Sequence, residues 1–163
     1  MADFKHLFGP VLSRRLGISL GVDLIPHKTC PLDCIYCEAG KTTNHTLKRE
    51  MFYPVSEIIS ELKAYLISSP KLDYITFSGS GEPLLYSGIG AVIKWIKENY
   101  SDYKIALITN SILLKDEPVR DEIINVDLIV PSIDAADQET FRKINRPVEG
   151  LDIEEVLHGM ELF

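Results

Sequence analysis

The sequence predicts an α/β protein built around an open parallel sheet. Four apolar runs of strand type alternate with segments whose apolar residues recur at helical spacing. The runs cover about residues 17–25, 74–78, 104–109 and 127–133. Alternation of this kind is typical of βαβ units, in which successive strands are parallel and the crossovers are right-handed. We count four strands, each followed by a helix, and treat residues 1–163 as one domain.

Each predicted helix has one apolar face. Between Val55 and Leu66 the apolar side chains follow i, i+3, i+4, i+7 spacing, and the pattern returns between Ile89 and Ile96. Aspartate is a favoured N-cap because its carboxylate accepts hydrogen bonds from free backbone N–H groups. Three aspartates precede the later helical patterns and are candidate N-caps: Asp116, Asp137 and Asp152.

Length and composition describe one ordinary globular domain. The chain has 163 residues, of which 45% are hydrophobic, and a net charge of −7. A chain of this size buries roughly two thirds of its unfolded surface. The composition excludes a disordered, collagen-like or small disulfide-stapled protein. Because the sequence has neither a secretory signal peptide nor an apolar run of membrane-spanning length, we expect a cytoplasmic protein without membrane contact.

The charge is distributed unevenly, with the acidic excess after residue 50. One interpretation is that the acidic residues form solvated helix faces. The other is that the basic residues of the N-terminal part face an anionic ligand. These basic residues are Arg14, Arg15, Lys28, Lys41, Lys48 and Arg49. The excess of basic over acidic residues in the N-terminal part is too small to predict a nucleic-acid surface.

Three cysteines in C-x3-C-x2-C spacing follow the first predicted strand: Cys30, Cys34 and Cys37. Clustered thiols in a chain without a secretory signal predict metal chemistry rather than disulfides. Three thiolates on a short loop can bind three irons of a cubane cluster and leave the fourth iron without a protein ligand. The alternatives are a Cys3His zinc site completed by His27 or His45, and unligated core cysteines.

The cysteine loop, with Tyr36 directly before Cys37, resembles the signature of radical S-adenosylmethionine (SAM) enzymes. In that family the three cysteines hold a 4Fe-4S cluster, and the amino and carboxylate groups of SAM bind the open iron. An electron from a donor such as flavodoxin or ferredoxin cleaves SAM to methionine and a 5′-deoxyadenosyl radical, which abstracts hydrogen from the substrate. The resemblance therefore implies two cofactors, the 4Fe-4S cluster and SAM, and an electron donor as partner.

A Ser80-Gly81-Glu82-Pro83 turn follows the second predicted strand. Its glycine lets the backbone approach a ligand closely, and its carboxylate can accept hydrogen bonds from an ammonium group. The alternative is a plain turn between strand and helix. The turn resembles the Gly-Gly-Glu turn that binds the SAM amino group in the family. Ser80 stands in place of the first glycine, where the contact would come from a main-chain carbonyl, and Glu82 would contribute its side chain.

Polar residues also follow the third and fourth predicted strands. Ligands of parallel α/β proteins bind at the carboxyl ends of the strands, where Asn110, Ser132 and Asp134 stand. The alternatives are an ordinary strand end and a helix cap. The family resemblance implies contacts from Asn110 to the cofactor, and from Ser132 and Asp134 to the carboxylate or ribose of SAM. No side chain is nominated as a general acid or base.

Residues 8–23 resemble a radical SAM subgroup related to the wybutosine-type tRNA-modifying enzymes, and we leave the substrate open between an RNA and a cofactor. The family core usually has six βα units, so we expect a partial barrel, truncated after about four units, with an exposed apolar sheet edge that pairs with another chain. The competing functions are a non-enzymatic zinc or cluster-binding module and an inactive scaffold.

Overall fold

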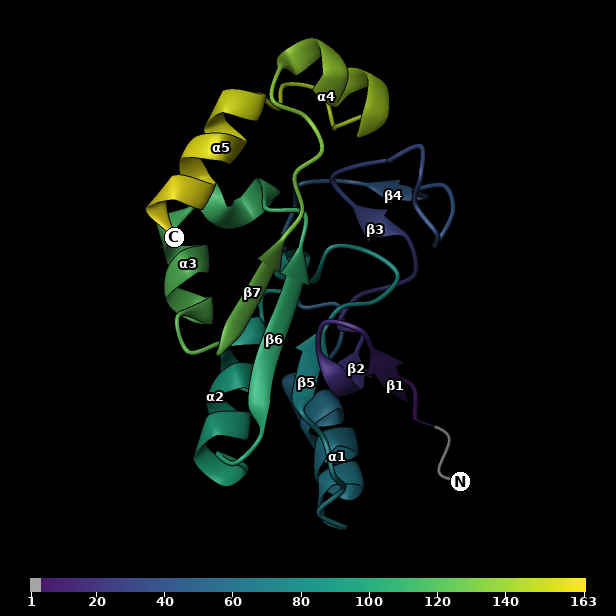
Figure 1. Ribbon diagram of the computed structural model, residues 1–163, viewed down its shortest axis with the longest axis vertical. Coiled ribbons are helices and arrows are strands. Elements are labelled where there is room, and N and C mark those ends of the chain that lie inside the picture. Colours follow the sequence, from purple (N-terminus) through teal and green to yellow (C-terminus); the bar gives the residue numbers. More distant parts are fainter. Residues whose placement is uncertain (1–3) are drawn as a thin grey trace.

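The computed structural model describes residues 4–163 and has a five-stranded sheet at its centre (Figure 1). The strands are arranged in the order β1 (Leu7–Ser13), β2 (Gly17–Val22), β5 (Tyr74–Phe77), β6 (Lys104–Thr109) and β7 (Leu128–Pro131). β1 is antiparallel to β2, and the other neighbouring strands are parallel. The predicted α/β class, with four parallel strands each followed by a helix, is confirmed.

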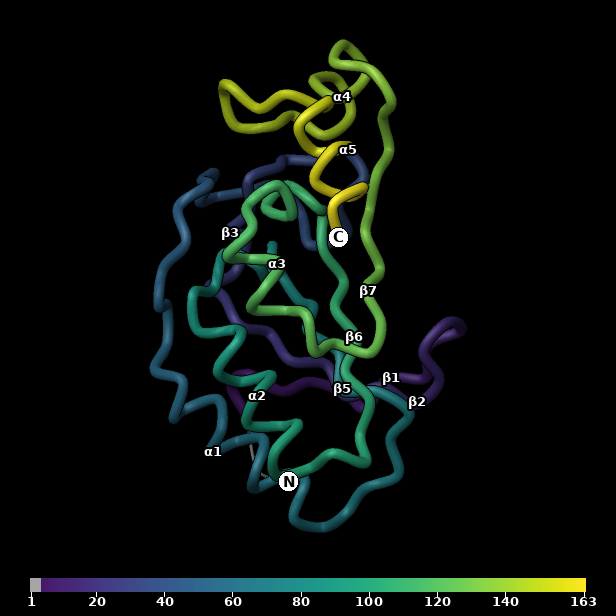
Figure 2. The backbone as a smooth tube through the Cα atoms, turned by 90° about the vertical axis from the view of Figure 1, so that its left-hand side faces the viewer, coloured from purple at the N-terminus to yellow at the C-terminus, as the bar shows by residue number. Residues whose placement is uncertain are grey.

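The helices lie on one side of the sheet and beyond its carboxyl end. α1 (Val55–Leu66), α2 (Ile89–Asn99) and α3 (Glu117–Ile123) lie on the same side of β5, β6 and β7 (Figure 2). α4 (Gln138–Ile144) lies beyond the ends of β6 and β7, and α5 (Ile153–Leu162) packs on the 3-10 helix η2 (Ile112–Lys115). The remaining elements are the short parallel strands β3 (Thr29–Cys30) and β4 (Asn44–His45) and the 3-10 helix η1 (Pro83–Leu85). None of the helices within residues 4–163 is long and apolar enough to cross a membrane.

The core forms where the apolar helix faces meet the sheet. Ile58, Leu62 and Leu66 of α1 stand four residues apart and are completely or almost completely buried. They belong to the same apolar cluster as Leu20 of β2 and Ile75 of β5. Since this cluster joins strands and helices along most of the chain, it fixes the strand ends from which the site loops emerge.

β1 is an edge strand that the sequence pattern did not predict. Most of its side chains are exposed, and its register with β2 shifts between Phe8 and Val11. Gly9 within it has a φ of +94°, a conformation that favours glycine. Because a bulged, exposed strand lacks regular alternation of apolar and polar residues, its sequence does not resemble that of a half-buried strand. β1 forms one edge of the sheet, and β7 forms the other.

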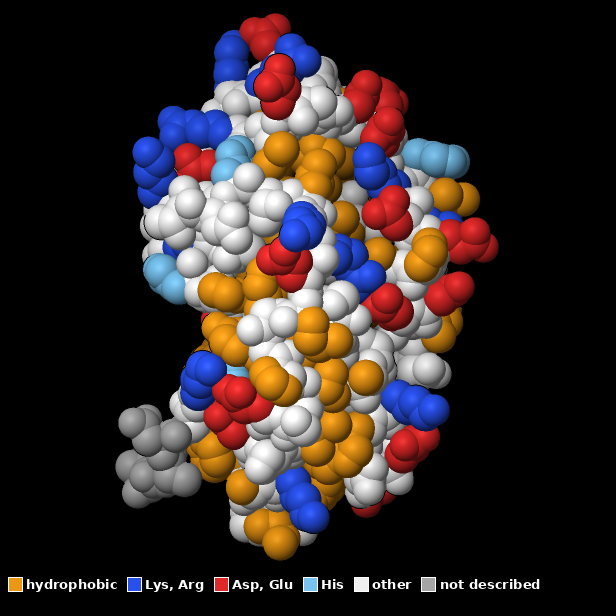
Figure 3. Space-filling model, turned by 180° about the vertical axis from the view of Figure 1, so that it is seen from behind, with side chains coloured by type: hydrophobic (Ala, Val, Ile, Leu, Met, Phe, Trp, Pro, Cys, Tyr) orange, Lys and Arg blue, Asp and Glu red, His pale blue; other side chains and the backbone are white. Residues whose placement is uncertain are grey.

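Charged side chains on the helical side of the molecule are mixed in sign (Figure 3). Several acidic residues there form ion pairs, such as Glu122 with Arg49 at 2.6 Å and Asp127 with Lys97 at 2.5 Å. This mixture agrees with the interpretation of solvated helix faces. Arg49 donates hydrogen bonds to both carboxylate oxygens of Glu122, so its charge is paired within the chain.

Two of the predicted N-caps provide a test of local stability. The Asp137 carboxylate accepts hydrogen bonds from Thr140 N at 2.9 Å and Thr140 Oγ1 at 2.8 Å, whereas Asp116 makes no side-chain capping bond to α3. Replacing Asp137 with alanine is expected to lower the free energy of unfolding by about 1 kcal/mol, measured by urea denaturation. Asp116→Ala is the matched control and should lower the free energy of unfolding by clearly less. Equal decreases in the two variants would contradict the assignment of Asp137 as an N-cap.

Candidate functional site

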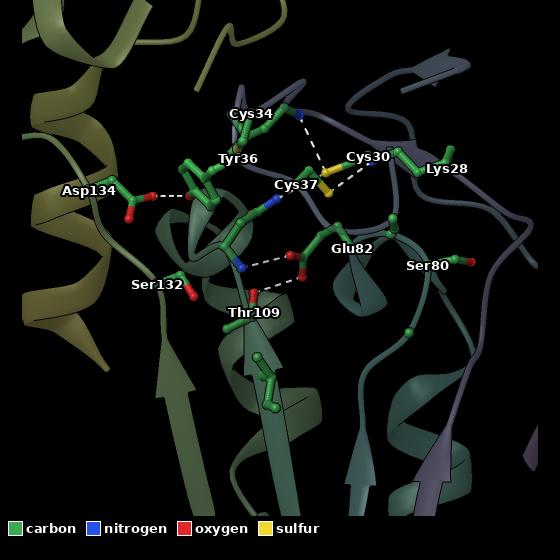
Figure 4. Close-up of a pocket in the computed structure, with 16 residues that line it drawn as sticks. Lys28, Cys30, Cys34, Tyr36, Cys37, Ser80, Glu82, Thr109, Ser132 and Asp134 are labelled. Atoms are coloured by element: carbon green, nitrogen blue, oxygen red, sulfur yellow. Dashed lines mark hydrogen bonds between the residues drawn. The ribbon is translucent and has the colours of Figure 1, made fainter. Parts of the chain in front are cut away.

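One pocket at the carboxyl ends of the parallel strands contains every residue predicted for the site (Figure 4). The cysteine loop enters it after β2, the Gly-Ser-Gly-Glu turn after β5, and two polar segments after β6 and β7. Parallel strands end at the same edge of a sheet, so loops far apart in sequence meet there. The ten residues are Cys30, Cys34, Tyr36, Cys37, Ser80, Gly81, Glu82, Asn110, Ser132 and Asp134.

Hydrogen bonds on two sides hold the cysteine loop. Thr42 N donates to Asp33 Oδ1 at 2.7 Å, and this bond is the first cause that holds the pKa of the Asp33 carboxyl below its usual range. On the other side, Asp33 N donates to Asn145 O and Ile35 N donates to Ile144 O, each at 2.9 Å. The loop is therefore fixed to the end of α4, more than a hundred residues away in the sequence.

Each of the three thiols accepts a hydrogen bond from a nitrogen of another side chain. Asn110 Nδ2 donates to Cys30 Sγ at 3.5 Å, Asn145 Nδ2 to Cys34 Sγ at 3.3 Å and Lys28 Nζ to Cys37 Sγ at 3.1 Å. Within residues 4–163, no three His, Cys, Asp or Glu side chains are grouped around the position of a single metal ion. Hydrogen-bond donors around the sulfurs suit thiolates that bind the irons of a cluster, so the residues present fit this group.

The thiol of Cys30 has a raised pKa. Burial is the main cause that raises its pKa to about 12, and the neighbouring Glu82 adds to it. The backbone N–H of Leu32, 3.5 Å from the sulfur, acts in the opposite direction. Because a metal binds the thiolate, binding at Cys30 must release a proton.

The Glu82 carboxylate is buried in the pocket wall and ties the turn to β6. Oε1 accepts a hydrogen bond from Thr109 Oγ1 at 2.7 Å, and Oε2 accepts one from Asn110 N at 2.8 Å (Figure 4). Oε1 also accepts a hydrogen bond from Leu84 N at 3.0 Å. A carboxylate offers about four acceptor positions. Three are used within the chain, which leaves Glu82 about one acceptor position for a ligand.

Glu82 makes the stability of the cofactor-free protein depend on pH. Burial raises its pKa to about 7, against the opposing hydrogen bonds. This pKa lies above that of Glu82 in the unfolded chain. The protonated Glu82 carboxyl therefore contributes its full stability below about pH 4.5, and this contribution is lost as the pH rises through about 7. Between pH 4.5 and 8, we expect the free energy of unfolding of wild type to fall by about 3 kcal/mol more than that of Glu82→Gln, measured by urea unfolding. A wild type that gains stability relative to the variant over this range would contradict the assignment.

The turn lies directly against the cysteine loop. A Cβ atom on Gly81 would stand 2.1 Å from Thr29 O, so only glycine allows this approach. Ser80 N and Oγ both donate to Asp23 Oδ2, at 3.0 and 2.9 Å. The Ser80 carbonyl, expected from the family resemblance to contact the ligand, accepts a hydrogen bond from Lys28 N at 3.0 Å.

A polar network closes the side of the pocket formed by β7. Tyr36 Oη donates to Asp134 Oδ2, and the pKa of Tyr36 is raised by burial first and by this bond second. Asn145 is 3% exposed and donates to Asp134 Oδ2 at 3.0 Å and Tyr36 Oη at 3.3 Å. Ser132 lines the same wall, and its backbone N donates to Thr109 O at 2.8 Å.

Comparison with known proteins identifies the family. The family model described as the radical SAM superfamily matches residues 24–163, which include the cysteine loop and all the pocket segments. The chain belongs to the radical SAM superfamily. The resemblance carried by the cysteine loop and the Glu82 turn is thus confirmed at the level of the superfamily.

Curated relatives match three quarters or more of this radical SAM chain but are longer than it. It is 44% identical over 156 residues to the GTPase Obg of Brachyspira hyodysenteriae, which is 96% of this chain and 23% of that protein. A UPF0026 protein of Methanocaldococcus jannaschii is 40% identical over 158 residues, 96% of this chain and 49% of that protein. A probable GTP 3′,8-cyclase of Saccharolobus islandicus is 29% identical over 131 residues, 75% of this chain and 39% of that protein. The chain therefore spans less than two thirds of the length of these relatives.

Sequence reasoning missed several residues that build the radical SAM pocket. Thr109 and Asp23 hold the turn by hydrogen bonds, and both stand at strand ends, a position that could have indicated them. Asn145 has no such signal, because its partners are distant in sequence. In the sequence, nothing separates Lys28 from the other basic residues of the N-terminal part, whereas the structure buries it beside Cys37.

Proposed function

We propose that this protein is a radical SAM enzyme in which Cys30, Cys34 and Cys37 bind a 4Fe-4S cluster and the adjoining pocket binds SAM. The observation that carries the proposal is the shared pocket of the three thiols and the Glu82 turn, which come from different strands. The three thiolates would hold the cluster, which would supply the one-electron chemistry that cleaves SAM to methionine and a hydrogen-abstracting 5′-deoxyadenosyl radical.

In this proposal the side chains bind and orient, and none moves a proton. The remaining acceptor position of Glu82 would take a hydrogen bond from the ammonium group of SAM. Ser132 and Asp134 offer a hydroxyl and a carboxylate oxygen to the other polar groups of SAM, and Tyr36 keeps the orientation of Asp134. Asn110 belongs to the same wall through its bonds to Glu82 and Cys30.

The contacts of the histidines support a cluster over a Cys3His zinc site. His27 is exposed, and His45 Nε2 lies 3.0 Å from Pro31 O. Neither is among the residues that line the cysteine pocket. A tetrahedral zinc site needs a fourth ligand beside the three thiolates, whereas a catalytic cluster uses three and keeps one iron open.

The substrate is proposed only as a class. The likeness to the wybutosine-type subgroup and to the probable GTP 3′,8-cyclases supports an RNA or a nucleotide-related cofactor as the molecule to be modified. The proposal takes no GTPase activity from the relative of that name, since only 23% of that protein is matched. A flavodoxin or ferredoxin as electron donor and a cytoplasmic location complete the proposal.

The outer edge of β7 supports the proposed self-association. Within residues 4–163, β7 has one neighbour in the sheet, β6, and Ile133, two residues beyond the end of β7, is 41% exposed. An open strand edge can pair with another chain. Light scattering behind size-exclusion chromatography should detect dimers at high protein concentration. A monodisperse monomer at every concentration would contradict this part of the proposal.

Anaerobic reconstitution with iron and sulfide tests the proposed function. Wild type should become brown, absorb broadly near about 400 nm, and form 5′-deoxyadenosine when given dithionite and SAM. Cys30→Ala should lose the colour, the absorbance and the formation of 5′-deoxyadenosine. Stoichiometric zinc in a colourless protein would support the zinc module instead. A cluster that forms without any 5′-deoxyadenosine would support the inactive scaffold.

A further inference from the structure

Lys28 is a buried lysine beside the cysteine loop. It is 2% exposed, and its backbone adopts a φ of +57°. Its N–H donates to Ser80 O at 3.0 Å, and its carbonyl accepts from Thr43 N and Asn44 N at 3.1 Å each. The residue is thus fixed between the Glu82 turn and the segment after the cysteines, and its side chain has little freedom to reach solvent.

The Lys28 ammonium group points to a cysteine and not to a carboxylate. Nζ lies 3.1 Å from Cys37 Sγ (Figure 4). No Asp or Glu in the described part of the chain forms an ion pair with it. Burial of an ammonium group without a negative partner is costly, so the position requires negative charge at or near Cys37.

The donor to Cys37 differs from the donors to the other two cysteines. Cys30 and Cys34 receive hydrogen bonds from the neutral amides of Asn110 and Asn145. Only Cys37 faces a cation among these three contacts. Net charge and hydrogen bonds to sulfur both set the reduction potential of an iron–sulfur cluster, and in a buried site an unscreened charge has a large effect.

We propose that Lys28 compensates the negative charge of the cluster at Cys37 and so makes its one-electron reduction easier. This inference rests on the proposed function. The electron comes from an external reductant, no bond forms or breaks in the step, and the cluster gains one negative charge beside the ammonium group. Because the reduced state gains more from a nearby cation than the oxidised state, Lys28 raises the reduction potential.

The test is the midpoint potential of the reconstituted protein, measured by titration with EPR detection, in wild type, Lys28→Met and Lys28→Gln. Methionine fills the buried volume without charge or donor, and glutamine removes the charge while keeping an N–H donor. Both variants should have a more negative midpoint potential than wild type when the potential is measured without SAM. If one variant does not retain the cluster, the other provides the measurement.

Lys41→Met is the matched control, because Lys41 follows Cys37 on the same loop and is exposed. Its potential should equal that of wild type. Unchanged potentials in both Lys28 variants, a shift in Lys28→Met alone, or weaker SAM binding at unchanged potential would each overturn the inference. A wild type without a reducible cluster would instead refute the proposed function itself, so the two failures are distinguishable.

Discussion

Replacing Cys34 with alanine is expected to abolish cluster binding and SAM cleavage. Cys34 is half-buried in the pocket, and its sulfur accepts a hydrogen bond from Asn145 Nδ2 at 3.3 Å. If the three thiolates hold a cluster as proposed, removing one of them would leave one cluster iron without its protein ligand. Loss of a residue that contacts a metal ligand typically lowers metal affinity or activity about 10- to 100-fold. Loss of a ligand itself should therefore reduce 5′-deoxyadenosine formation by more than about 100-fold. Iron analysis and chromatography of the products provide the two readouts.

Ile35→Ala is the control for Cys34→Ala, because Ile35 is the next residue on the loop and is 60% exposed. This variant should keep the iron content and cleavage rate of wild type. If Cys34→Ala retained wild-type iron and activity, Cys34 would not be a cluster ligand.

Replacing Gly81 with alanine is expected to separate the turn from the cysteine loop. The new Cβ would lie 2.1 Å from Thr29 O and 2.6 Å from Ile25 Cδ1, closer than real contacts allow. The Thr29 carbonyl also accepts the hydrogen bond from Glu82 N at 3.1 Å, so movement there displaces the carboxylate as well. We expect a loss of about 1–3 kcal/mol in the free energy of unfolding, as for other overpacked sites, together with weaker SAM binding.

Gly90→Ala is the control for Gly81→Ala. Gly90 lies within α2, where an added Cβ would be 3.1 Å from Glu122 Cβ, and alanine favours a helix. Its stability should stay within about 1 kcal/mol of wild type, with unchanged SAM binding. Wild-type stability and SAM affinity in Gly81→Ala would show that the close contact between turn and loop is dispensable.

The regular part of the fold was predictable because apolar periodicity reflects burial. The pattern over Val55–Leu66 gives the bounds of α1, and the apolar run at Lys104–Thr109 gives those of β6. β1 was not predictable in this way, since an exposed strand with a register shift has no alternating pattern. The two-residue strands β3 and β4 are too short for any periodicity to appear.

The site was predictable as a location and only partly as a set of contacts. Asn110, Ser132 and Asp134 follow strand ends in the sequence, and parallel strands share one carboxyl edge. Their positions therefore predict that they lie in the same pocket as the cysteines, as the structure shows. The hydrogen bonds of Asn145 and the burial of Lys28 depend on tertiary packing of the α4 end and the Glu82 turn against the loop. No local sequence pattern encodes such contacts.

The most direct test of the central claim is the EPR spectrum of the reconstituted, dithionite-reduced protein with and without SAM. If Cys30, Cys34 and Cys37 hold a 4Fe-4S cluster and the pocket beside Glu82 binds SAM at the open iron, saturating SAM should change the g-values of the reduced cluster. A cluster signal unaffected by SAM, or no cluster signal in wild type, would contradict the account.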